Sequence, residues 1–293
     1  MEKLTIFTPT YNRRDQIIKL YYSLCRQTIS DFVWLIVDDG SVDGTQAQVE
    51  RWIEEKRVFI QYYRQKNSGK YKALEQGIAF CETPWFICVD SDDQLENNAV
   101  QTMVKDIALS RNANCIGFIY PRRMREVATQ QWMPENVNEV HIVDTRILYG
   151  VTETAILCKT EYLKKLIFKQ FPEEKFVSEE VLYVQLVQYG KFVVRKDAFY
   201  LSEYQQDGLT KNLFKHWIEN PRSTIFLLRG RFCDSVRYPP WICLRERIKC
   251  ILNLNAVCLC CNLPIKKHTP SLAYSYLLYF PSILWREMRF IRY

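Results

Sequence analysis

The sequence predicts an α/β fold: a mainly parallel sheet with helices on both faces, followed by a helical C-terminal extension. Three observations carry this prediction. Apolar strand-like runs alternate with amphipathic helical segments through residues 1–112. Two of the strands end abruptly in clustered acids, as VWLIVDDG and WFICVDSDD. Beyond Leu213 the apolar residues recur at helical spacing.

The elements of the first half follow one another at short intervals. Strands are predicted at residues 4–8, 33–37, 58–63 and 85–89. Helices are predicted at residues 14–27, 44–56, 71–81 and about 97–110. Strictly alternating strands and helices favour a parallel sheet that is covered on both faces by helices. In many proteins such a sheet forms the half of the domain that binds a nucleotide.

The second half has a less regular pattern. A strand at 115–120 precedes a polar segment without clear period at 121–140, which we expect to be a loop at the rim of the site. Order then resumes at 140–143. Further elements are predicted as a strand at 154–158, helices at 161–168 and 178–189, and a strand region at 192–204.

Length and composition indicate which class of protein this chain belongs to. A chain of 293 residues with 48% hydrophobic residues can bury a substantial core. We expect a main domain at 1–212, with halves at 1–112 and 113–212, and a C-terminal region at 213–293. The start MEKLTIFTPTYN has no long apolar signal region, so the eleven cysteines are interpreted as reduced thiols of a cytoplasmic protein.

The C-terminal region is both basic and apolar. Residues 241–293 hold eight Lys or Arg against two acids, and the runs CILNLNAVCLC and SLAYSYLLYFPSILW are shorter than the ~20 residues of a spanning helix. Two interpretations stay open: a peripheral anchor on the anionic inner face of the cytoplasmic membrane, or a helical layer packed on the main domain. No nucleic-acid-binding motif accompanies the charge, so nucleic acid is not an expected partner.

The acids of VDSDD are the strongest candidates for chemistry. Asp90 and Asp92 stand at positions i and i+2, which project to one side of an extended segment. Carboxylates at the carboxyl end of a strand can hold a hard divalent cation and a nucleotide in the crevice beyond the sheet. A helix cap would account for one aspartate but poorly for three.

Three other turns could complete such a crevice. In TPTYN the ring of Tyr11 could stack on a base, and in VDDGS the carboxylate of Asp39 could accept from a base N–H or a ribose hydroxyl. In KNSGKYK, Gly69 permits close backbone approach while Lys70 and Lys72 supply positive charge for a diphosphate. Taken alone, each turn can also be explained without a ligand, because the same residue types are common in loops and helix caps.

In FVSEEV, Ser178 is a candidate N-cap followed by Glu179 and Glu180 in the first helical turn. The helix dipole favours acids there whatever the function. If the turn faces the crevice, one glutamate can act as general base toward an acceptor hydroxyl.

Together, TPTYNR, VDDGSVDGT, NSGKYKALEQGI, VDSDD and SEEV closely resemble the inverting glycosyltransferase family 2, which has the glycosyltransferase A (GT-A) fold. The resemblance covers residues 1–110 strongly and 150–212 moderately. ETAILCKTEYLKKL, KFVSEEVLY and EYQQDGLTKN are further similar to bacterial members that assemble capsule, O-antigen or exopolysaccharide repeat units.

The resemblance implies roles for individual residues. The residues implied to bind the nucleotide-sugar are Thr8, Pro9, Tyr11, Asp39, Lys70, Asp90 and Ser91. Asp92 is implied to be the direct ligand of Mn²⁺ or Mg²⁺. The usual catalytic Glu-Asp pair is here Glu179 and Glu180; alignment on the pair favours Glu180 as the base, and Glu179 is the alternative.

The implied reaction is transfer of one sugar from a nucleotide-sugar, UDP-hexose or UDP-N-acetylhexosamine, to a glycan acceptor carried on a lipid. The processive members add a Gln-x-x-Arg-Trp motif and spanning helices, and the sequence shows neither. Two rivals remain. A nucleotidyltransferase would open with a Gly-rich phosphate loop, whereas this chain opens with TPTYNRR; an inactive membrane-associated scaffold would not need Asp92 and the glutamate pair.

Overall fold

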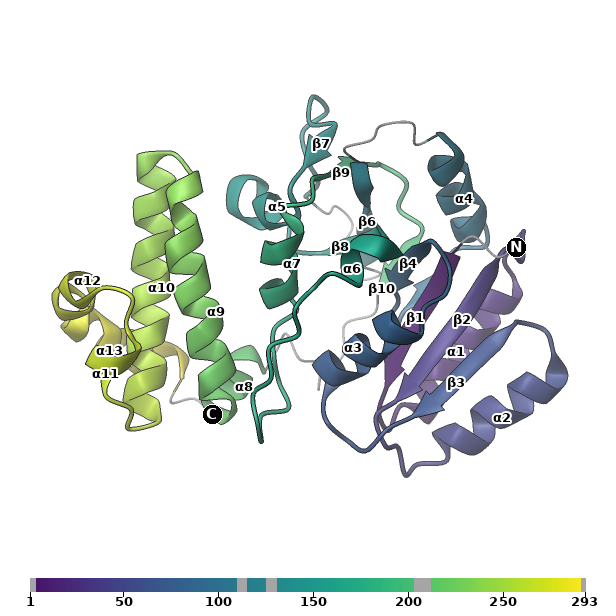
Figure 1. Ribbon diagram of the computed structural model, residues 1–293, viewed down its shortest axis with the longest axis horizontal. Helices are drawn as coiled ribbons and strands as arrows, with labels where there is room; N and C mark the ends of the chain where they lie inside the picture. Colours follow the sequence, from purple (N-terminus) through teal and green to yellow (C-terminus); the bar gives the residue numbers. More distant parts are fainter. Residues whose placement is uncertain (1–3, 110–114, 125–130, 203–211, 291–293) are drawn as a thin grey trace. The chain divides into compact units, whose positions relative to one another are not determined.

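The computed structural model describes residues 4–109, 115–124, 131–202 and 212–290 (Figure 1). The chain divides into two compact units. Unit 1 is Met1–Phe168 with Leu182–Tyr204, and unit 2 is Lys169–Val181 with Gln205–Tyr293. The segment that carries the glutamate pair therefore belongs to the unit of the C-terminal helices.

The first half of unit 1 is a parallel sheet in the order β3-β2-β1-β4. Its strands are β1 (Leu4–Thr10), β2 (Phe32–Asp38), β3 (Ile60–Arg64) and β4 (Trp85–Cys88). The helices between them are α1 (Arg14–Cys25), α2 (Thr45–Glu55) and α3 (Lys70–Phe80), and α4 (Ala99–Leu109) comes after β4. Every residue of β1 and β2 is buried, as expected of strands covered on both faces, so the predicted α/β architecture is confirmed.

Different side chains hold the helices to each face of this sheet. On one face Tyr21 of α1 stacks on Trp52 of α2, with ring centroids 4.2 Å apart, and both rings pack on Trp34 of β2. On the other face Gly77 of α3 lies so close to β1 that an added Cβ would come within 2.2 Å of the Phe7 ring. Figure 1 shows α3 on one side of the sheet and α1 on the other.

The second half of unit 1 extends the sheet with mixed pairing. Its strands are β5 (Gln94–Leu95), β6 (Cys115–Met124), β7 (Glu139–Val140), β8 (Thr154–Lys159), β9 (Lys191–Val194) and β10 (Tyr200–Ser202). Strand β8 lies antiparallel between β4 and β6, whereas β9 and β10 pair parallel with β6. Short β5 pairs antiparallel with β10 and brings the acidic segment after β4 to this part of the sheet.

Several predicted elements of this half were wrong in detail. Strand β6 runs four residues into the segment expected to be a loop, and the apolar residues after position 140 begin helix α5 (Ile142–Tyr149). Short apolar runs do not distinguish strand from helix, and Gly150, at φ +70°, ends this helix. The region at 192–204 contains two strands, and residues 203–204 lie outside the described ranges. The two later helices are the shorter α6 (Thr160–Leu163) and α7 (Glu180–Leu186).

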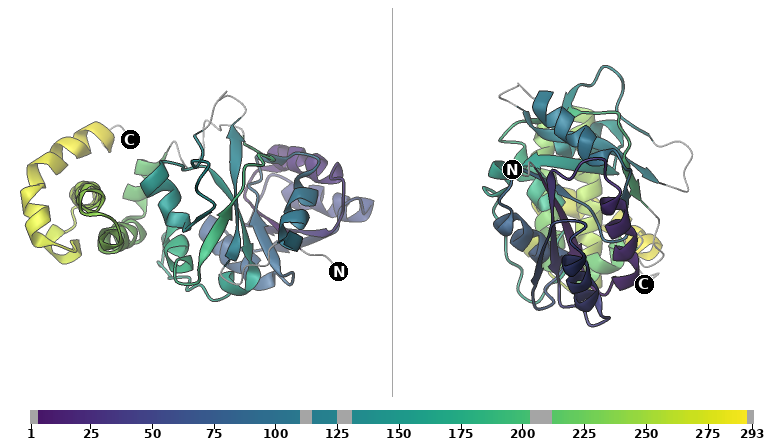
Figure 2. Two further views of the ribbon diagram at one scale, coloured as in Figure 1. Left: turned by 90° about the horizontal axis from the view of Figure 1, so that it is seen from above. Right: turned by 90° about the vertical axis from the view of Figure 1, so that its right-hand side faces the viewer.

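The described part of unit 2 after residue 211 is mainly helical, which confirms the predicted C-terminal extension. Its helices are α8 (Leu213–Glu219), α9 (Pro221–Asp234), a 3₁₀ turn η1 (Ser235–Arg237), α10 (Pro240–Cys260), α11 (Ile265–His268), α12 (Leu272–Leu277) and α13 (Tyr279–Arg289). Figure 2 shows α10 nearly end-on, with α9 on one side and the yellow helices α11–α13 curving round the other. Trp217, Leu228, Leu254 and Phe290 form part of one core between them. No helix in the described ranges is long and apolar enough to cross a bilayer.

Candidate active site

The loops that follow β1 and β2 are hydrogen-bonded to each other. The main-chain N–H of Asn12 donates to Ser41 Oγ at 2.9 Å, and the N–H of Val42 donates to Asn12 Oδ1 at 2.9 Å. Tyr11 is exposed between them. The turn expected to stack on a base and the first acidic turn are therefore neighbours at the carboxyl edge of the sheet, where α/β folds bind ligands.

Thr8 and Pro9 lie within β1 itself. Thr8 is fully buried, and its hydroxyl accepts a hydrogen bond from Trp34 Nε1 at 3.0 Å. This hydrogen bond gives the buried indole N–H an acceptor and fixes the position of the Thr8 side chain inside the sheet. Its implied contact with a nucleotide stays a prediction.

Asp39 holds the loop between β3 and α3. Its Oδ1 accepts hydrogen bonds from Gln65 Nε2 and from the main-chain N–H of Ser68, and its Oδ2 accepts one from the N–H of Gly69, all at 2.7 Å. Gly69 has φ +93°, a conformation that side chains rarely adopt. The carboxylate and the glycine together fix the loop that presents Lys70.

Lys70 forms an ion pair with the acidic segment after β4. Its Nζ lies 2.6 Å from Asp90 Oδ1, and Arg122 Nη1 lies 3.5 Å from Asp90 Oδ2. Burial raises the pKa of Asp90, but the charges of Lys70 and Arg122 outweigh it and lower that pKa to about 2. The predicted second lysine, Lys72, is instead paired with Glu75 at 2.8 Å.

Asp92 differs from both of its acidic neighbours. No other side chain in the described ranges forms an ion pair or hydrogen bond with it. Burial, and then the nearby charge of Asp90, raise the pKa of Asp92 above its usual value. Ser91, between the two aspartates, is buried. Asp92 is thus a half-buried carboxylate in surroundings that favour added positive charge.

Asp93 is hydrogen-bonded to Tyr200 of strand β10. The Tyr200 hydroxyl donates to Asp93 Oδ2 at 2.8 Å and accepts from the main-chain N–H of Asp90 at 3.0 Å. The Arg122 guanidinium lies 4.4 Å above the Tyr200 ring, and its Nε donates to the Thr154 carbonyl at 3.1 Å. Burial, and then the charge of Asp90, raise the pKa of Asp93 to about 7, although Arg122 acts in the opposite direction.

Sequence reasoning missed Arg122, Tyr200 and the role of Asp93. Arg122 stands in the segment expected to be a loop, and Tyr200 in an apparently ordinary strand region. The two meet because β6 and β10 pair in parallel, with Tyr200 opposite Arg122. No local pattern reveals that register.

Glu180 is the first residue of α7 and belongs to unit 2, and its carboxylate is paired with Arg231 of α9. Arg231 Nε donates to Glu180 Oε1 at 2.7 Å, and Arg231 Nη2 donates to Glu180 Oε2. Burial lowers the pKa of Arg231, but Glu180 outweighs that effect and raises it. The N–H of Glu180 donates to Ser178 Oγ at 3.4 Å, a capping contact, and Glu179 is half-buried just before the helix. The aspartates belong to unit 1 and the glutamates to unit 2.

Curated relatives are bacterial glycosyltransferases that are longer than this chain. Poly(ribitol-phosphate) beta-N-acetylglucosaminyltransferase TarS of Staphylococcus aureus (strain MW2) is 24% identical over 219 residues, which are 71% of this chain and 36% of TarS. Chondroitin synthase of Escherichia coli is 31% identical over 114 residues, 39% of this chain and 16% of the synthase. The chain thus spans about a third of TarS and less of the synthase.

Solved glycosyltransferases share the fold. A crystal structure of S. aureus TarS in complex with UDP-GlcNAc matches with a TM-score of 0.56 and 18% identity, covering 87% of this chain and 81% of that one. Mannosyltransferase PcManGT from Pyrobaculum calidifontis, in complex with GDP-Man and Mn²⁺, matches with a TM-score of 0.56 and 16% identity, covering 98% and 83%. These likenesses confirm the GT-A fold. Residues 5–166 match the family description "Glycosyl transferase family 2", and this chain, with its acidic strand ends on a GT-A sheet, belongs to that family of glycosyltransferases.

Proposed function

We propose that this glycosyltransferase is inverting and metal-dependent, and that it moves one hexose or N-acetylhexosamine from a UDP-sugar to a lipid-linked glycan acceptor in bacterial surface polysaccharide synthesis. One observation carries the donor half of this proposal. Asp92 forms no ion pair or hydrogen bond with another side chain of the described chain, whereas Asp90 beside it is paired with Lys70 and Arg122. The carboxylates therefore divide into one that can take a cation and one that is already paired.

The residues present fit a hard divalent cation. Asp92 offers an anionic oxygen, the ligand type that Mg²⁺ and Mn²⁺ prefer. The described residues contain no group of three or more His, Cys, Asp or Glu that could hold an ion by themselves. Water and the donor diphosphate would supply the other ligands, as is common for Mg²⁺ sites that bind one or two carboxylates. Bound there, the metal would supply charge neutralisation for the UDP leaving group.

Lys70 would complete that neutralisation. Its ammonium is held by Asp90 at 2.6 Å, and the main chain before it is fixed by Asp39. A cation positioned in advance stabilises developing negative charge without rearrangement during the reaction. Tyr11, exposed beside the Asp39 turn, is the proposed stacking partner of the base.

The proposed base is one of the two glutamates of unit 2. We keep Glu180 as the first choice: Arg231 fixes the position of its carboxylate, which would take the proton of the acceptor hydroxyl. That pairing also weakens a carboxylate as proton acceptor, which makes Glu179 a real alternative. Attack from the face opposite the leaving group would convert an α-linked donor into a β-linked product.

Support for the donor and cofactor comes from relatives. The matched TarS structure contains UDP-GlcNAc, and the matched mannosyltransferase contains GDP-Man with Mn²⁺. The test is a panel of UDP-sugars and GDP-mannose incubated with the protein, with and without Mn²⁺. Hydrolysis of one UDP-sugar that needs the metal, and release of sugar with inverted anomeric configuration, would support the proposal. A preference for GDP-mannose, or retained configuration, would contradict it.

A further inference from the structure

The outermost helices of unit 2 carry several large apolar side chains on the solvent side. Phe280, Leu284 and Met288 recur every four residues along α13 and are 77%, 67% and 62% exposed. Leu277, which ends the preceding helix α12, is also 77% exposed. Residues spaced by four lie on one face of a helix, so Phe280, Leu284 and Met288 form one continuous stripe, the α13 stripe.

The opposite face of α12 and α13 is polar where it packs on α10. Asn255 of α10 is fully buried, and its Nδ2 donates to the Ser275 carbonyl at 3.1 Å and to Ser282 Oγ at 3.2 Å. Trp285 Nε1 donates to Asn253 Oδ1 at 3.0 Å. The inward face thus combines buried serines with large apolar side chains such as Phe290 and Trp285, while further large apolar side chains remain on the outer face.

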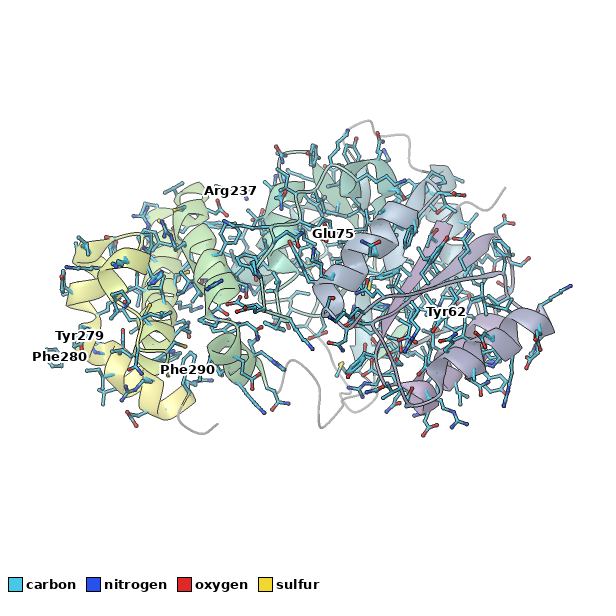
Figure 3. The ribbon with its side chains drawn as sticks, turned by 60° about the horizontal axis from the view of Figure 1, so that its bottom comes forward. Tyr62, Glu75, Arg237, Tyr279, Phe280 and Phe290 are labelled. Carbon is cyan, nitrogen blue, oxygen red and sulfur yellow. The ribbon has the colours of Figure 1, made fainter. Side chains whose placement is uncertain are left out.

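Figure 3 shows the same division: Tyr279 and Phe280 project from the outer edge of the yellow helices, whereas Phe290 lies on the inner side. Phe290 is 1% exposed and packs edge-on against Phe214, so the helix is firmly seated through its other face. A contiguous exposed apolar row on a well-anchored helix marks an interaction surface.

Exposed cations accompany the α13 stripe. Lys266 and Lys267 of α11 and Arg289 at the end of α13 are exposed. Two copies of this chain meeting through the stripe would bring like charges together, which opposes self-association. Anionic lipid headgroups instead complement the cations, while the acyl boundary accepts the apolar side chains. Tyr276 and Tyr279 are the amphipathic type enriched at that boundary.

We propose that the α13 stripe and the exposed lysines of α11 form a membrane-docking surface that lies on anionic lipid. The surface does not depend on the identity of donor or acceptor, so it stands apart from the proposed reaction. Of the two interpretations of the basic, apolar tail, the proposal takes the interfacial anchor, carried by a helix whose other face packs on α10.

Vesicle sedimentation with the full chain tests the proposal. Wild-type protein should sediment with vesicles of phosphatidylcholine and phosphatidylglycerol in equal parts, and much less with phosphatidylcholine alone. The triple variant Phe280→Ser, Leu284→Ser, Met288→Ser should bind at least about tenfold more weakly, because it removes three side chains that would leave water. Lys266→Gln with Lys267→Gln should cost roughly fivefold for each lysine at low salt.

A matched control removes three equally exposed apolar side chains of unit 1, Phe59→Ser, Leu109→Ser and Ile167→Ser, which are 57%, 62% and 74% exposed. This control should bind vesicles like the wild type. Circular dichroism spectra and thermal melting curves like those of the wild type would establish that each variant is folded. Vesicle binding that is absent in the wild type, or equal in the stripe variant and the wild type, would overturn the proposal. So would a wild-type dimer that the stripe variant dissociates without any binding to vesicles.

Discussion

The Tyr200 hydroxyl donates a hydrogen bond to Asp93 at 2.8 Å, and the same oxygen accepts one from the main-chain N–H of Asp90 at 3.0 Å. One atom of β10 thus links both ends of the acidic turn that contains Asp92. Arg122 covers the ring of the same tyrosine and contacts both Asp90 and Asp93. The turn after β4 is therefore held by two residues far from it in the sequence.

Replacing Tyr200 with Phe should make the acidic turn after β4 less ordered. It should leave no cavity in the core, because the ring stays and only the hydroxyl is lost. Two hydrogen bonds disappear, and we expect the free energy of unfolding to fall by about 1 to 3 kcal/mol. We also expect the metal concentration for half-maximal activity to rise roughly tenfold, a change of about 1.4 kcal/mol. Titration of activity against Mn²⁺ at saturating donor measures it.

The control is Tyr120→Phe, because Tyr120 is also buried and its hydroxyl also donates to an aspartate, Asp106, at 2.9 Å. It should lose similar stability while its metal dependence stays unchanged. Equal metal dependence in the two variants would show that Tyr200 is merely structural.

Replacing Lys70 with Met removes the cation that pairs with Asp90. Donor affinity should fall by roughly tenfold or more, because a charge-assisted contact is worth about 1.5 to 3 kcal/mol. Calorimetry with UDP and, separately, with uridine distinguishes the cause: only UDP binding should weaken. Lys196→Met, at an exposed ion pair with Glu135, is the matched control. Loss of uridine binding to the same extent would place Lys70 at the base instead of the diphosphate.

The Asp39→Asn variant keeps the size of the side chain but turns one acceptor oxygen into an amino group. That group cannot accept from the N–H groups of Ser68 or Gly69, so the loop before α3 should lose order. Hydrogen exchange at residues 66–70 should accelerate, and UDP affinity should fall. Asp43→Asn, at a carboxylate that accepts from Arg14 and Thr45 in the loop before α2, should leave that segment unchanged. Unaltered exchange at 66–70 would contradict the anchoring role.

The pH profile of an Arg231→Met variant distinguishes the two glutamates. If Glu180 is the base, loss of the guanidinium makes its charged form less favourable. The acidic limb of kcat/KM should then move to higher pH, while activity at high pH is retained in part. If Glu179 is the base, the limb should stay in place. Glu180→Gln and Glu179→Gln, compared in turnover with UDP binding retained, provide the second readout.

Periodicity predicted the parallel half of the sheet because β1 and β2 are buried on both faces and each helix has one apolar face. The wrong elements are those with short or mixed patterns. Helix α5 has eight residues, and its short apolar start did not indicate whether the ordered run at 140–143 was a strand or a helix. Strand β6 continues through PRRM, where polar residues gave no alternating signal.

The residues of the candidate site also fall into those that the sequence located and those that it could not locate. Asp39, Lys70, Asp90 and Asp92 each follow a strand or precede a helix, so position in the chain indicated the edge where they gather. Tyr200 and Arg122 could not be found, because their contact depends on the register of β6 and β10, which a single sequence does not contain. The same limit hid the ion pair of Arg231 with Glu180, and the sequence could not show that the apolar residues of α13 face outward.

The central claim is that Asp92, alone among the three aspartates in lacking a side-chain partner in the described chain, holds the metal that binds UDP. Calorimetry of UDP binding to wild type and Asp92→Ala, with and without Mn²⁺, tests it most directly, with the exposed Asp15→Ala as control. We predict that wild type and control bind UDP tightly only with Mn²⁺, and that Asp92→Ala loses most of this metal-dependent affinity. Metal-independent binding, or binding unchanged in Asp92→Ala, would contradict the account.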